Sequence, residues 1–569
     1  MKATRMTNRK SFQIPLFICC FLFLAPAVVT TGWADDPAAY GPRCIRDQLK
    51  VYESMAQPVD PGDYQMSDGM TPPPDPGLGD SWDWYIWHLA GYPTATLESC
   101  TIRGVGDNVY VVVEDSRWNV HVNQEDVDLI LEHFDNSSVG PYPTQGIWDL
   151  NTSHFGFPPD PLDNDPRIYI LYYDFDVSSD GFFWIYDQYP DGTQPFASNE
   201  CEVIYLSCAV SDPGGDYLTA VAAHEFEHMI HHNYDTNESS WVDEGCAELA
   251  MWLYGNPDNI VGFNSVPDNN LSVWNGTFSD YIKTYLWTLY FFERYGGQVA
   301  INNLVQQPGN GIPGYEAVLD AMGYTENFAD VFSDWVVANY VDDETLLDGR
   351  FGYSGESLPV FTSILRSSYP AGPYNAAVQH WAADYVKFIN GEPLGLLFNG
   401  LDSSTFAARV VTYSGGLATG VQDLPLDENQ DGLLDFEDFG GSVDQLVLVA
   451  ANLTSGTGSV TYSYATTTPA DVADLPAAAS SWLTAAPNPL RPGGALRFQT
   501  PRDVSVQVEL YDAAGRRVWS WAREEVSAGI QEIPWDGRAS SGALLAPGYY
   551  FARMRAGGLT KTSGVVVIN

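Results

Sequence analysis

His224-Glu225-Phe226-Glu227-His228 is the stretch that decides the fold of this chain. Apolar residues recur around it at helical spacing, so we expect a helix over roughly 216–232. Residues four apart on a helix are neighbours on one face, and His224 and His228 can therefore reach a single ion. Glu225 lies about 100° further round the helix, beside the same face. The pattern predicts a zinc ion held by both imidazoles, with Glu225 as the general base that takes a proton from water.

Two histidines leave a zinc site incomplete, so a third ligand is needed. His232 lies about 12 Å along the helix from His224, too far for zinc–nitrogen bonds of about 2.0–2.1 Å. A metzincin-type extension needs Gly at 231 and His at 234, where this chain has His231 and Tyr234. Glu244, on the next predicted helix, remains as the third ligand. His231 and His232 are then most simply exposed residues near a helix end.

Glu248 follows Glu244 by four residues and shares its helix face. It is placed to accept the second ring N–H of a ligand histidine, although a solvated helix face explains it equally well. The stretches Ala222–Ile230 and Trp241–Glu248 together resemble the gluzincin metallopeptidases, most of all the secreted bacterial hyicolysin-type enzymes. The resemblance is strongest over about 200–345. It implies zinc, peptide hydrolysis and the roles already inferred from the residues.

Gluzincins also supply a Tyr or His that stabilises the oxyanion of the tetrahedral intermediate. The resemblance assigns this role to Tyr281 or Tyr285 on a predicted helix over 279–295, although aromatic residues at this spacing more often belong to a core. The expected activity is that of a secreted zinc-dependent endopeptidase, which hydrolyses peptide bonds of extracellular proteins by metal-activated water. The alternative is a non-catalytic surface adhesin or binding protein on a degenerate peptidase fold. The intact Glu225 separates the two and favours the enzyme.

The charge and the first residues of the chain indicate export. The 569 residues carry a formal net charge of −47, which disfavours nucleic acid and anionic lipid as partners. A basic start, an apolar run from Ile14 to Val29 and the small-residue site Gly32-Trp33-Ala34 predict a signal peptide over 1–34. No later stretch is long and apolar enough for a membrane span. A secreted, extracellular or cell-surface location follows.

Five cysteines remain after the signal peptide: Cys44, Cys100, Cys201, Cys208 and Cys246. Cys44–Cys100 is the first disulfide to consider in an oxidising compartment. Cys201 and Cys208 flank a strand-like run, and seven extended residues span roughly 23 Å, so these two cannot bridge across a straight strand.

The chain is predicted to be α+β, with strands followed by long helices in a gluzincin-type zinc peptidase domain at 106–345. Residues 35–105 are rich in Pro, Gly and Asp and are expected to form an N-terminal extension or propeptide. A β-sandwich is predicted over 346–465 and a linker over 466–484. The last segment, 485–569, has the pattern of an Ig-like β-sandwich.

The C-terminal segment resembles the Ig-like domains that end many exported bacterial proteins, including flagellar-hook-cap-type and type IX sorting domains. The motifs that carry this resemblance are Pro487-Asn488-Pro489, Tyr511–Arg516, Trp535–Arg538 and Gly548–Phe551. It implies contact with secretion machinery or attachment to the cell surface.

A structural Ca²⁺ site is also predicted, in an EF-hand-like loop with Gly432 at its sixth position. The loop offers oxygen atoms from Asp427, Asn429, Asp431, Leu433, Asp435 and Asp438. An ordinary Asp/Gly turn in a very acidic protein is the competing explanation. The acidic cluster at 160–165 is expected to be a plain turn.

Overall fold

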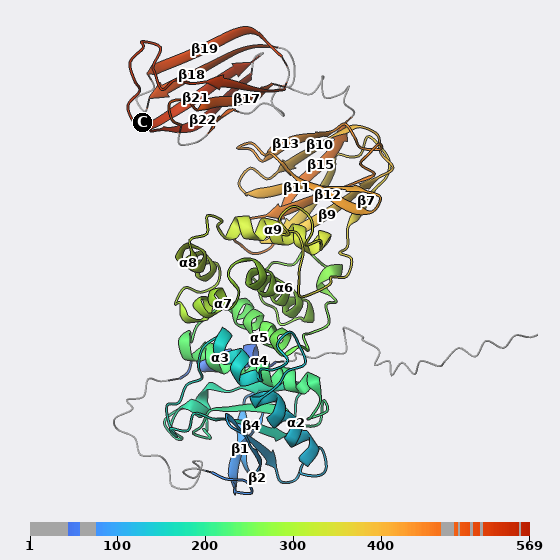
Figure 1. Ribbon diagram of the computed structural model, residues 1–569, viewed down its shortest axis with the longest axis vertical. Coiled ribbons are helices and arrows are strands. Elements are labelled where there is room, and N and C mark those ends of the chain that lie inside the picture. The colour runs from blue at the N-terminus through green and yellow to red at the C-terminus, as the bar shows by residue number, and fades with distance from the viewer. Residues whose placement is uncertain are drawn as a thin grey trace, which may run out of the picture. The chain divides into compact units, whose positions relative to one another are not determined.

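The computed structural model (Figure 1) describes residues 44–56, 76–467, 483–486, 490–500, 504–512, 516–527, 529–556 and 559–568. All of these belong to one compact unit, Tyr40–Asn569. The predicted signal peptide and most of the predicted linker lie outside the described residues.

The first part of the chain is built on a six-stranded sheet in the order β1-β2-β3-β4-β6-β5. The central strands β3, β4 and β6 run parallel, and their nearly continuous burial is typical of strands covered on both faces. β5 pairs antiparallel with β6 and forms one edge of the sheet. The bounds of the strands are β1 Ser81–His88, β2 Thr94–Val105, β3 Val109–Glu114, β4 Ile168–Tyr173, β5 Gly181–Phe183 and β6 Val203–Ser207.

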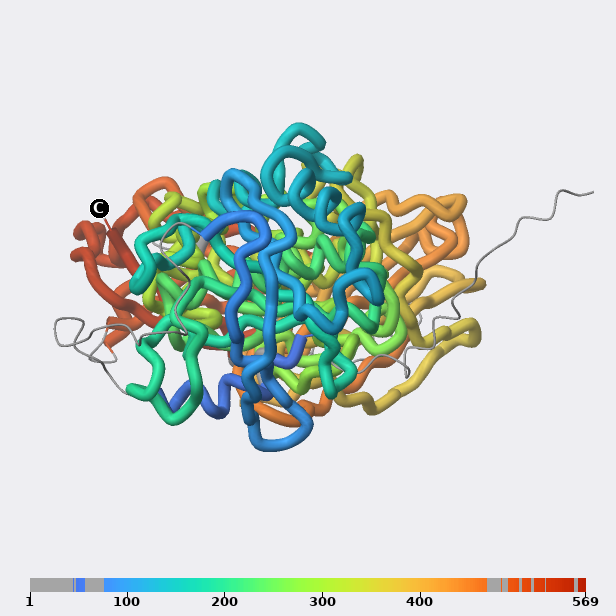
Figure 2. Tube along the Cα trace, turned by 90° about the horizontal axis from the view of Figure 1, so that it is seen from below, coloured from blue at the N-terminus to red at the C-terminus, as the bar shows by residue number. Residues whose placement is uncertain are grey.

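Strands β1 and β2 lie in the segment 35–105 that was expected to be an extension. They pair with each other along their length, and β2 continues the pairing into β3. Figure 2 shows the two strands side by side in blue. Trp84 and Trp87 of β1 are at most 1% exposed. The sheet therefore begins before residue 106. The strands were not predicted, because the Pro- and Gly-rich composition around them is typical of an irregular segment.

Helices cover the sheet and continue away from it (Figure 1). The helices predicted over 216–232 and 279–295 are confirmed to within two residues as α4 and α6, and the helix predicted to carry Glu244 is α5. α4 packs on β5 and β6, and α5 packs between α4 and α6. The bounds are α1 Arg46–Glu53, α2 Gln124–Asp135, α3 Ile147–His154, α4 Asp216–Tyr234, α5 Ser240–Tyr254, α6 Phe278–Arg294, α7 Gly297–Gln306, α8 Ile312–Met322 and α9 Phe328–Val341, with 3₁₀ turns η2 Ile185–Gln188 and η3 Phe263–Ser265.

Two sheets follow the helices, in the orders β13-β10-β15-β8 and β12-β11-β14-β9-β7. Their inward residues, among them Phe398 and Val410, share one hydrophobic core, which is the arrangement of a β-sandwich. The bounds are β7 Ile364–Arg366, β8 Tyr374–Gln379, β9 Ala382–Ile389, β10 Leu394–Gly400, β11 Phe406–Ser414, β12 Leu417–Leu424, β13 Asp431–Phe436, β14 Gln445–Asn452 and β15 Ser459–Thr467.

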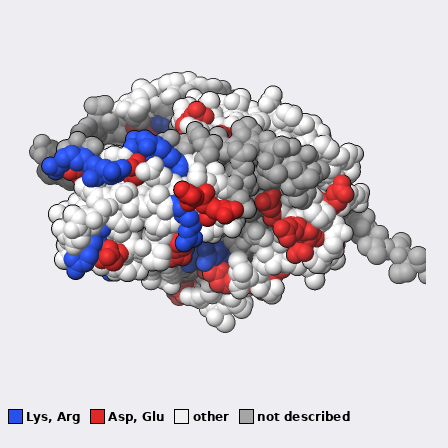
Figure 3. Space-filling model, turned by 90° about the horizontal axis from the view of Figure 1, so that it is seen from above, with Lys and Arg blue, Asp and Glu red and all other residues white. Residues whose placement is uncertain are grey.

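The C-terminal part is a second, smaller sandwich of two sheets, β16-β17-β20 and β19-β18-β21-β22. Its core includes Phe498, Leu510 and Trp535. Residues 485–569 carry ten Lys and Arg against seven Asp and Glu, in contrast to the acidic remainder; Figure 3 shows Lys and Arg gathered on one part of the surface. The bounds are β16 Leu483–Ala486, β17 Ala495–Thr500, β18 Val504–Asp512, β19 Arg517–Val526, β20 Gly529–Pro534, β21 Gly548–Ala556 and β22 Leu559–Val567.

The five cysteines in the described part of the chain are all buried and none of them forms a disulfide. The Cys44–Cys100 bridge considered from the sequence is therefore wrong. Cys100 lies in β2, whereas Cys44 forms an isolated parallel bridge with Gly181 at the start of β5. Cys201 and Cys208 lie on either side of β6 and remain unbridged, as the length of the strand requires.

Candidate metal centre

The candidate site is built on two adjacent helices, α4 and α5. Every residue of α4 from Leu218 to His232 is buried, so this is an interior helix. α5 is buried from Trp241 to Tyr254. Gly245 allows α5 to approach α6 closely, because a Cβ at this position would overlap Oγ1 of Thr288. The two helices thus carry their polar side chains in a packed interior, where positions are tightly fixed.

The three predicted ligands converge on one point. Nε2 of His224 and Nε2 of His228 are 3.1 Å apart. Oε2 of Glu244 is 3.4 Å from the first nitrogen and 3.7 Å from the second. Ligand atoms held tetrahedrally around one zinc ion at about 2.0–2.1 Å lie about 3.3–3.4 Å from one another. The three separations in this chain are therefore close to those that one zinc ion requires.

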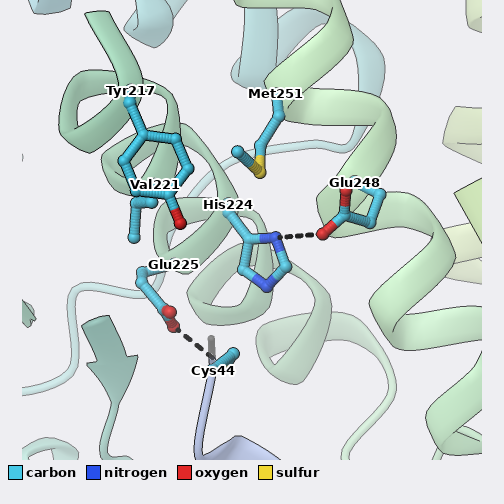
Figure 4. A pocket seen from close by; sticks show the side chains of 7 residues that line it. All are labelled: Cys44, Tyr217, Val221, His224, Glu225, Glu248 and Met251. Atoms are coloured by element: carbon cyan, nitrogen blue, oxygen red, sulfur yellow. Dashed lines mark hydrogen bonds and ion pairs between the residues drawn. The ribbon is translucent and has the colours of Figure 1, made fainter. Parts of the chain in front are cut away.

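A carboxylate lies behind each histidine. Oδ1 of Asp243 is 2.9 Å from Nδ1 of His228, and Oε1 of Glu248 is 3.5 Å from Nδ1 of His224 (Figure 4). An ionised carboxylate only accepts hydrogen bonds, so it favours the imidazole tautomer with its proton on Nδ1. In that tautomer Nε2 presents a lone pair to a metal. On its other side, Asp243 pairs with Nζ of Lys50 at 2.6 Å.

This arrangement is difficult to explain without a cation. Oε2 of Glu244 is buried and has no hydrogen-bond partner among the described residues. It faces Nε2 of His228, which Asp243 leaves as an acceptor, and Nε2 of His224. Buried acceptor atoms directed at one point repel one another unless a positive charge lies between them. These buried groups can hold a metal ion, and their chemistry, two imidazoles and one carboxylate, fits zinc.

Glu225 is fully buried beside this cluster. Its Oε2 is 3.6 Å from Sγ of Cys44, and Gly181 leaves room for the side chain, since a Cβ there would come within 2.9 Å of Cγ of Glu225. Burial raises the pKa of Glu225 above its usual range, which suits a proton acceptor.

The structure separates the two candidate oxyanion donors. The hydroxyl of Tyr281 donates to the backbone carbonyl of Cys44 at 3.1 Å, in the buried region next to the cluster. The hydroxyl of Tyr285 instead donates to Oε1 of Glu356. Tyr281 is therefore the tyrosine whose hydroxyl already contacts a carbonyl oxygen beside the site.

Sequence reasoning missed two residues of the site and misplaced two others. Cys44 was assigned to a disulfide, and its Sγ instead lies with the three predicted ligands, all four atoms within 4.8 Å of one another. Asp243, adjacent to Glu244, was not expected to contact a ligand histidine. His231 and His232, expected to be exposed, are 1% and 8% exposed because α4 continues through the interior. Nδ1 of His231 lies 3.1 Å from Oε1 of Glu227, which extends the polar network.

The expected calcium loop over 427–438 is not formed. Residues from Asp431 to Phe436 form strand β13, which pairs with β10 in regular antiparallel register. Asp431 and Asp435 are thus about 13 Å apart along an extended strand, which exceeds the reach of one ion at about 2.3–2.6 Å. The turn before the strand is closed by Asp427, whose Oδ1 accepts the backbone N–H groups of Asn429 and Asp431. Strand pairing has overridden the loop pattern.

Residues 492–558 match the family model of the FlgD Ig-like domain, which confirms the predicted Ig-like fold of the C-terminal segment. No curated protein matches the chain. Among the solved structures, dimeric latent PorU from Porphyromonas gingivalis is 17% identical, over 37% of this chain and 19% of that one, with a TM-score of 0.17.

PorZ, a surface component of the type-IX secretion system of P. gingivalis, is 18% identical over 27% of this chain and 21% of its own, with a TM-score of 0.13. A β-glucuronidase of glycoside hydrolase family 2 is 11% identical over 34% of this chain and 24% of its own, with a TM-score of 0.15. The chain thus spans about a fifth to a quarter of these chains, and TM-scores this low carry no conclusion about fold or activity. No helix in the described part of the chain is long and apolar enough to cross a membrane.

Proposed function

We propose that this chain is a zinc metallopeptidase that hydrolyses peptide bonds of extracellular proteins. The observation that carries the proposal is the convergence of His224, His228 and Glu244 beside the buried carboxylate of Glu225. Zinc held there would polarise a peptide carbonyl and a water molecule. The gluzincin-like order of these residues along the chain supports the same reaction class.

Each side chain of the site has a separate role in the proposed reaction. Glu225 takes the proton from the attacking water and returns it to the leaving amine. Tyr281 donates a hydrogen bond to the carbonyl oxygen as negative charge develops on it, which is where such a donor is most effective. Asp243 and Glu248 hold the two histidines with their Nε2 atoms forward.

The test is zinc content and casein cleavage by the purified chain, beside Glu225→Gln as the matched variant. The proposal expects bound zinc in both proteins and cleavage that falls by at least about 10²-fold in the variant, because the proton acceptor is lost. Since the chain as described places Cys44 at the site, both measurements are also made in the Cys44→Ser background. Bound zinc without cleavage in any sample would favour the alternative, a binding protein on a peptidase fold. Absence of metal would refute the proposal.

We further propose that the chain is exported and that its Ig-like C-terminal domain serves secretion or surface attachment. The support is the N-terminal signal pattern together with the match of residues 492–558 to the FlgD Ig-like domain. Fractionation of cells that express the full chain, or a chain ending at residue 484, tests this. Equal export and surface retention of both would contradict a role for the domain.

A further inference from the structure

The N-terminal helix α1 and the residues before it are docked on the candidate metal centre. Ile45 and Leu49 are buried in the main hydrophobic core, and Nζ of Lys50 pairs with Asp243 at 2.6 Å. The hydroxyl of Tyr186 donates to the backbone carbonyl of Tyr52 at 2.7 Å. Apolar, ionic and hydrogen-bond contacts thus hold residues 44–52 in place.

Cys44, at the start of this segment, reaches the centre itself. Its Sγ shares one cluster with the ligand atoms of His224, His228 and Glu244. Figure 4 shows the thiol directed toward Glu225, 3.6 Å from Oε2. Two imidazoles, one carboxylate and one thiolate make a complete tetrahedral zinc set, whereas a catalytic site must keep one position open for water. With Cys44 in place, that position is filled.

The backbone of Cys44 also takes the place expected for a substrate. Its carbonyl accepts the hydroxyl of Tyr281, the donor assigned above to a substrate carbonyl. Its bridge to Gly181 joins it to β5, the edge strand of the sheet. The edge of a sheet is a common binding place for an extended peptide. The segment therefore blocks both the metal position and the peptide position.

We propose that Cys44 is the fourth zinc ligand and that residues 44–52 hold the enzyme latent by occupying its substrate site; this rests on the proposed peptidase function. On release the sulfur–metal bond breaks, the thiolate leaves with its electron pair and takes up a proton from solvent, and the vacated position opens to water. The Lys50–Asp243 pair is lost in the same movement, so the ionic contact and the sulfur ligand act together.

The test uses the full chain loaded with zinc or with cobalt(II), beside Cys44→Ser. Zinc-edge X-ray absorption is expected to show one sulfur at about 2.3 Å in the wild type and only nitrogen and oxygen ligands in the variant. The sulfur-to-cobalt charge-transfer band should be lost in parallel. Cys100→Ser, another buried cysteine outside the cluster, is the matched control and keeps both signals. A wild-type spectrum without sulfur overturns the assignment.

The proposed latency is tested separately, by the rate of casein cleavage. Casein cleavage should rise at least about tenfold in Cys44→Ser, since the open position is what metal-assisted hydrolysis needs. Lys50→Met, which leaves the thiol in place, is expected to give a smaller rise. If both the wild type and Cys44→Ser cleave casein at the same rate, latency is refuted. If neither cleaves, the peptidase function fails, and the sulfur signal still decides whether Cys44 is a ligand.

A second, independent observation concerns Asp160, Asp163 and Glu202, whose carboxylate oxygens lie within 4.8 Å of one another near the starts of β4 and β6. Glu202 is 1% exposed, and neither of its oxygens has a hydrogen-bond partner among the described residues. Oδ2 of Asp163 is likewise buried and has no hydrogen-bond partner among the described residues. Arg167 donates two hydrogen bonds to the carboxylate of Asp165. Asp165 is not one of the three clustered residues, so this contact does not neutralise the cluster.

We infer that these three carboxylates bind a hard divalent cation, calcium, which prefers carboxylate oxygens at about 2.3–2.6 Å. Such an ion neutralises a buried carboxylate that nothing else in the described structure contacts by a hydrogen bond. It also ties the turn before β4 to the residue before β6. The calcium expected from the sequence thus belongs in the peptidase domain, at a cluster that the sequence treated as a plain turn.

The test is the melting temperature and the heat of Ca²⁺ binding of the zinc-saturated full chain, beside Glu202→Gln. Calcium is expected to raise the melting temperature by several degrees in the wild type and by much less in the variant. Asp427→Asn, in the loop first predicted to bind calcium, is the matched control and keeps the full effect. No heat and no shift in the wild type, or a shift that survives in Glu202→Gln, overturns the inference.

Discussion

Asp243→Asn is expected to weaken zinc binding more than Glu248→Gln does. Each change replaces a carboxylate behind a ligand histidine by an amide of the same shape. Oδ1 of Asp243 lies 2.9 Å from Nδ1 of His228, whereas Oε1 of Glu248 lies 3.5 Å from Nδ1 of His224. Because N–H···O hydrogen bonds span about 2.7–3.2 Å, the first contact is a hydrogen bond and the second is a longer ionic contact.

The size of the effect follows from the tautomer of the imidazole. Loss of a carboxylate that orients a ligand histidine lowers metal affinity about 10–100-fold, which is about 1.4–2.7 kcal/mol. At position 243 we expect the upper figure, because an amide can turn its NH₂ toward Nδ1 and move the proton of His228 to Nε2, the metal-facing atom. At position 248 we expect about tenfold or less, since the longer contact constrains His224 less.

Zinc affinity is measured by competition with a chelator, with every variant in the Cys44→Ser background so that sulfur ligation does not contribute. Lys50→Met is the matched control, since it removes the ion pair on the far side of Asp243 but leaves the carboxylate. Because it takes a positive charge away from the metal position, we expect no loss of zinc affinity. Equal losses for Asp243→Asn and Glu248→Gln would refute the reasoning, as would a loss from Lys50→Met as large as that from Asp243→Asn.

Three further predictions concern packing and protonation. Gly245→Ala should lower the free energy of unfolding by about 1–3 kcal/mol in urea denaturation, because its Cβ overlaps Thr288, and Thr288→Ala in the same chain should recover part of the loss. Burial raises the pKa of Asp187 from its ordinary 3.8 to about 7, so the folded chain binds more protons than the unfolded chain between these pH values. The free energy of unfolding should therefore fall as the pH rises from about 4 to about 7. Asp187→Asn should flatten that part of the stability profile. Gly181→Ala should displace Glu225 and reduce casein cleavage in the Cys44→Ser background without loss of zinc, and an unchanged rate would contradict this.

The helices and the placement of His224 and His228 on one helix face could be predicted from the sequence, because both follow from local periodicity. The spacing of His224 and His228 needs only the helical repeat, and Glu244 follows by exclusion of other ligands within reach. The bounds of α4 and α6 agree with the prediction to within two residues. The calcium loop failed for the opposite reason, since strand pairing with β10 is a long-range contact that overrode a local motif.

The rest of the site depends on contacts that no local pattern contains. Cys44 and Glu225 are 181 residues apart in the chain, and only the docking of α1 brings them together. Two features of the sequence pointed to Cys44, the odd number of cysteines and its position in a Pro- and Gly-rich segment. Both features fit a disulfide as well as they fit a place at the metal site. The contact of Asp243 with the site could have been predicted, because Asp243 is an acidic neighbour of the third predicted ligand on an interior helix.

The interior of the site carries more acid than base, and this excess connects the metal with the N-terminal segment. Glu225, Glu227, Asp243, Glu244 and Glu248 are each at most 2% exposed, and residues 216–254 contain no Lys or Arg. Buried like charges are tolerated only when opposite charge lies close to them. A bound divalent ion would supply that charge at the front of the histidines, and the single Lys of α1 supplies it behind one of them. If the segment is released as proposed, the metal alone would offset the carboxylates, and the released chain should hold zinc more through this electrostatic attraction than through its number of ligands.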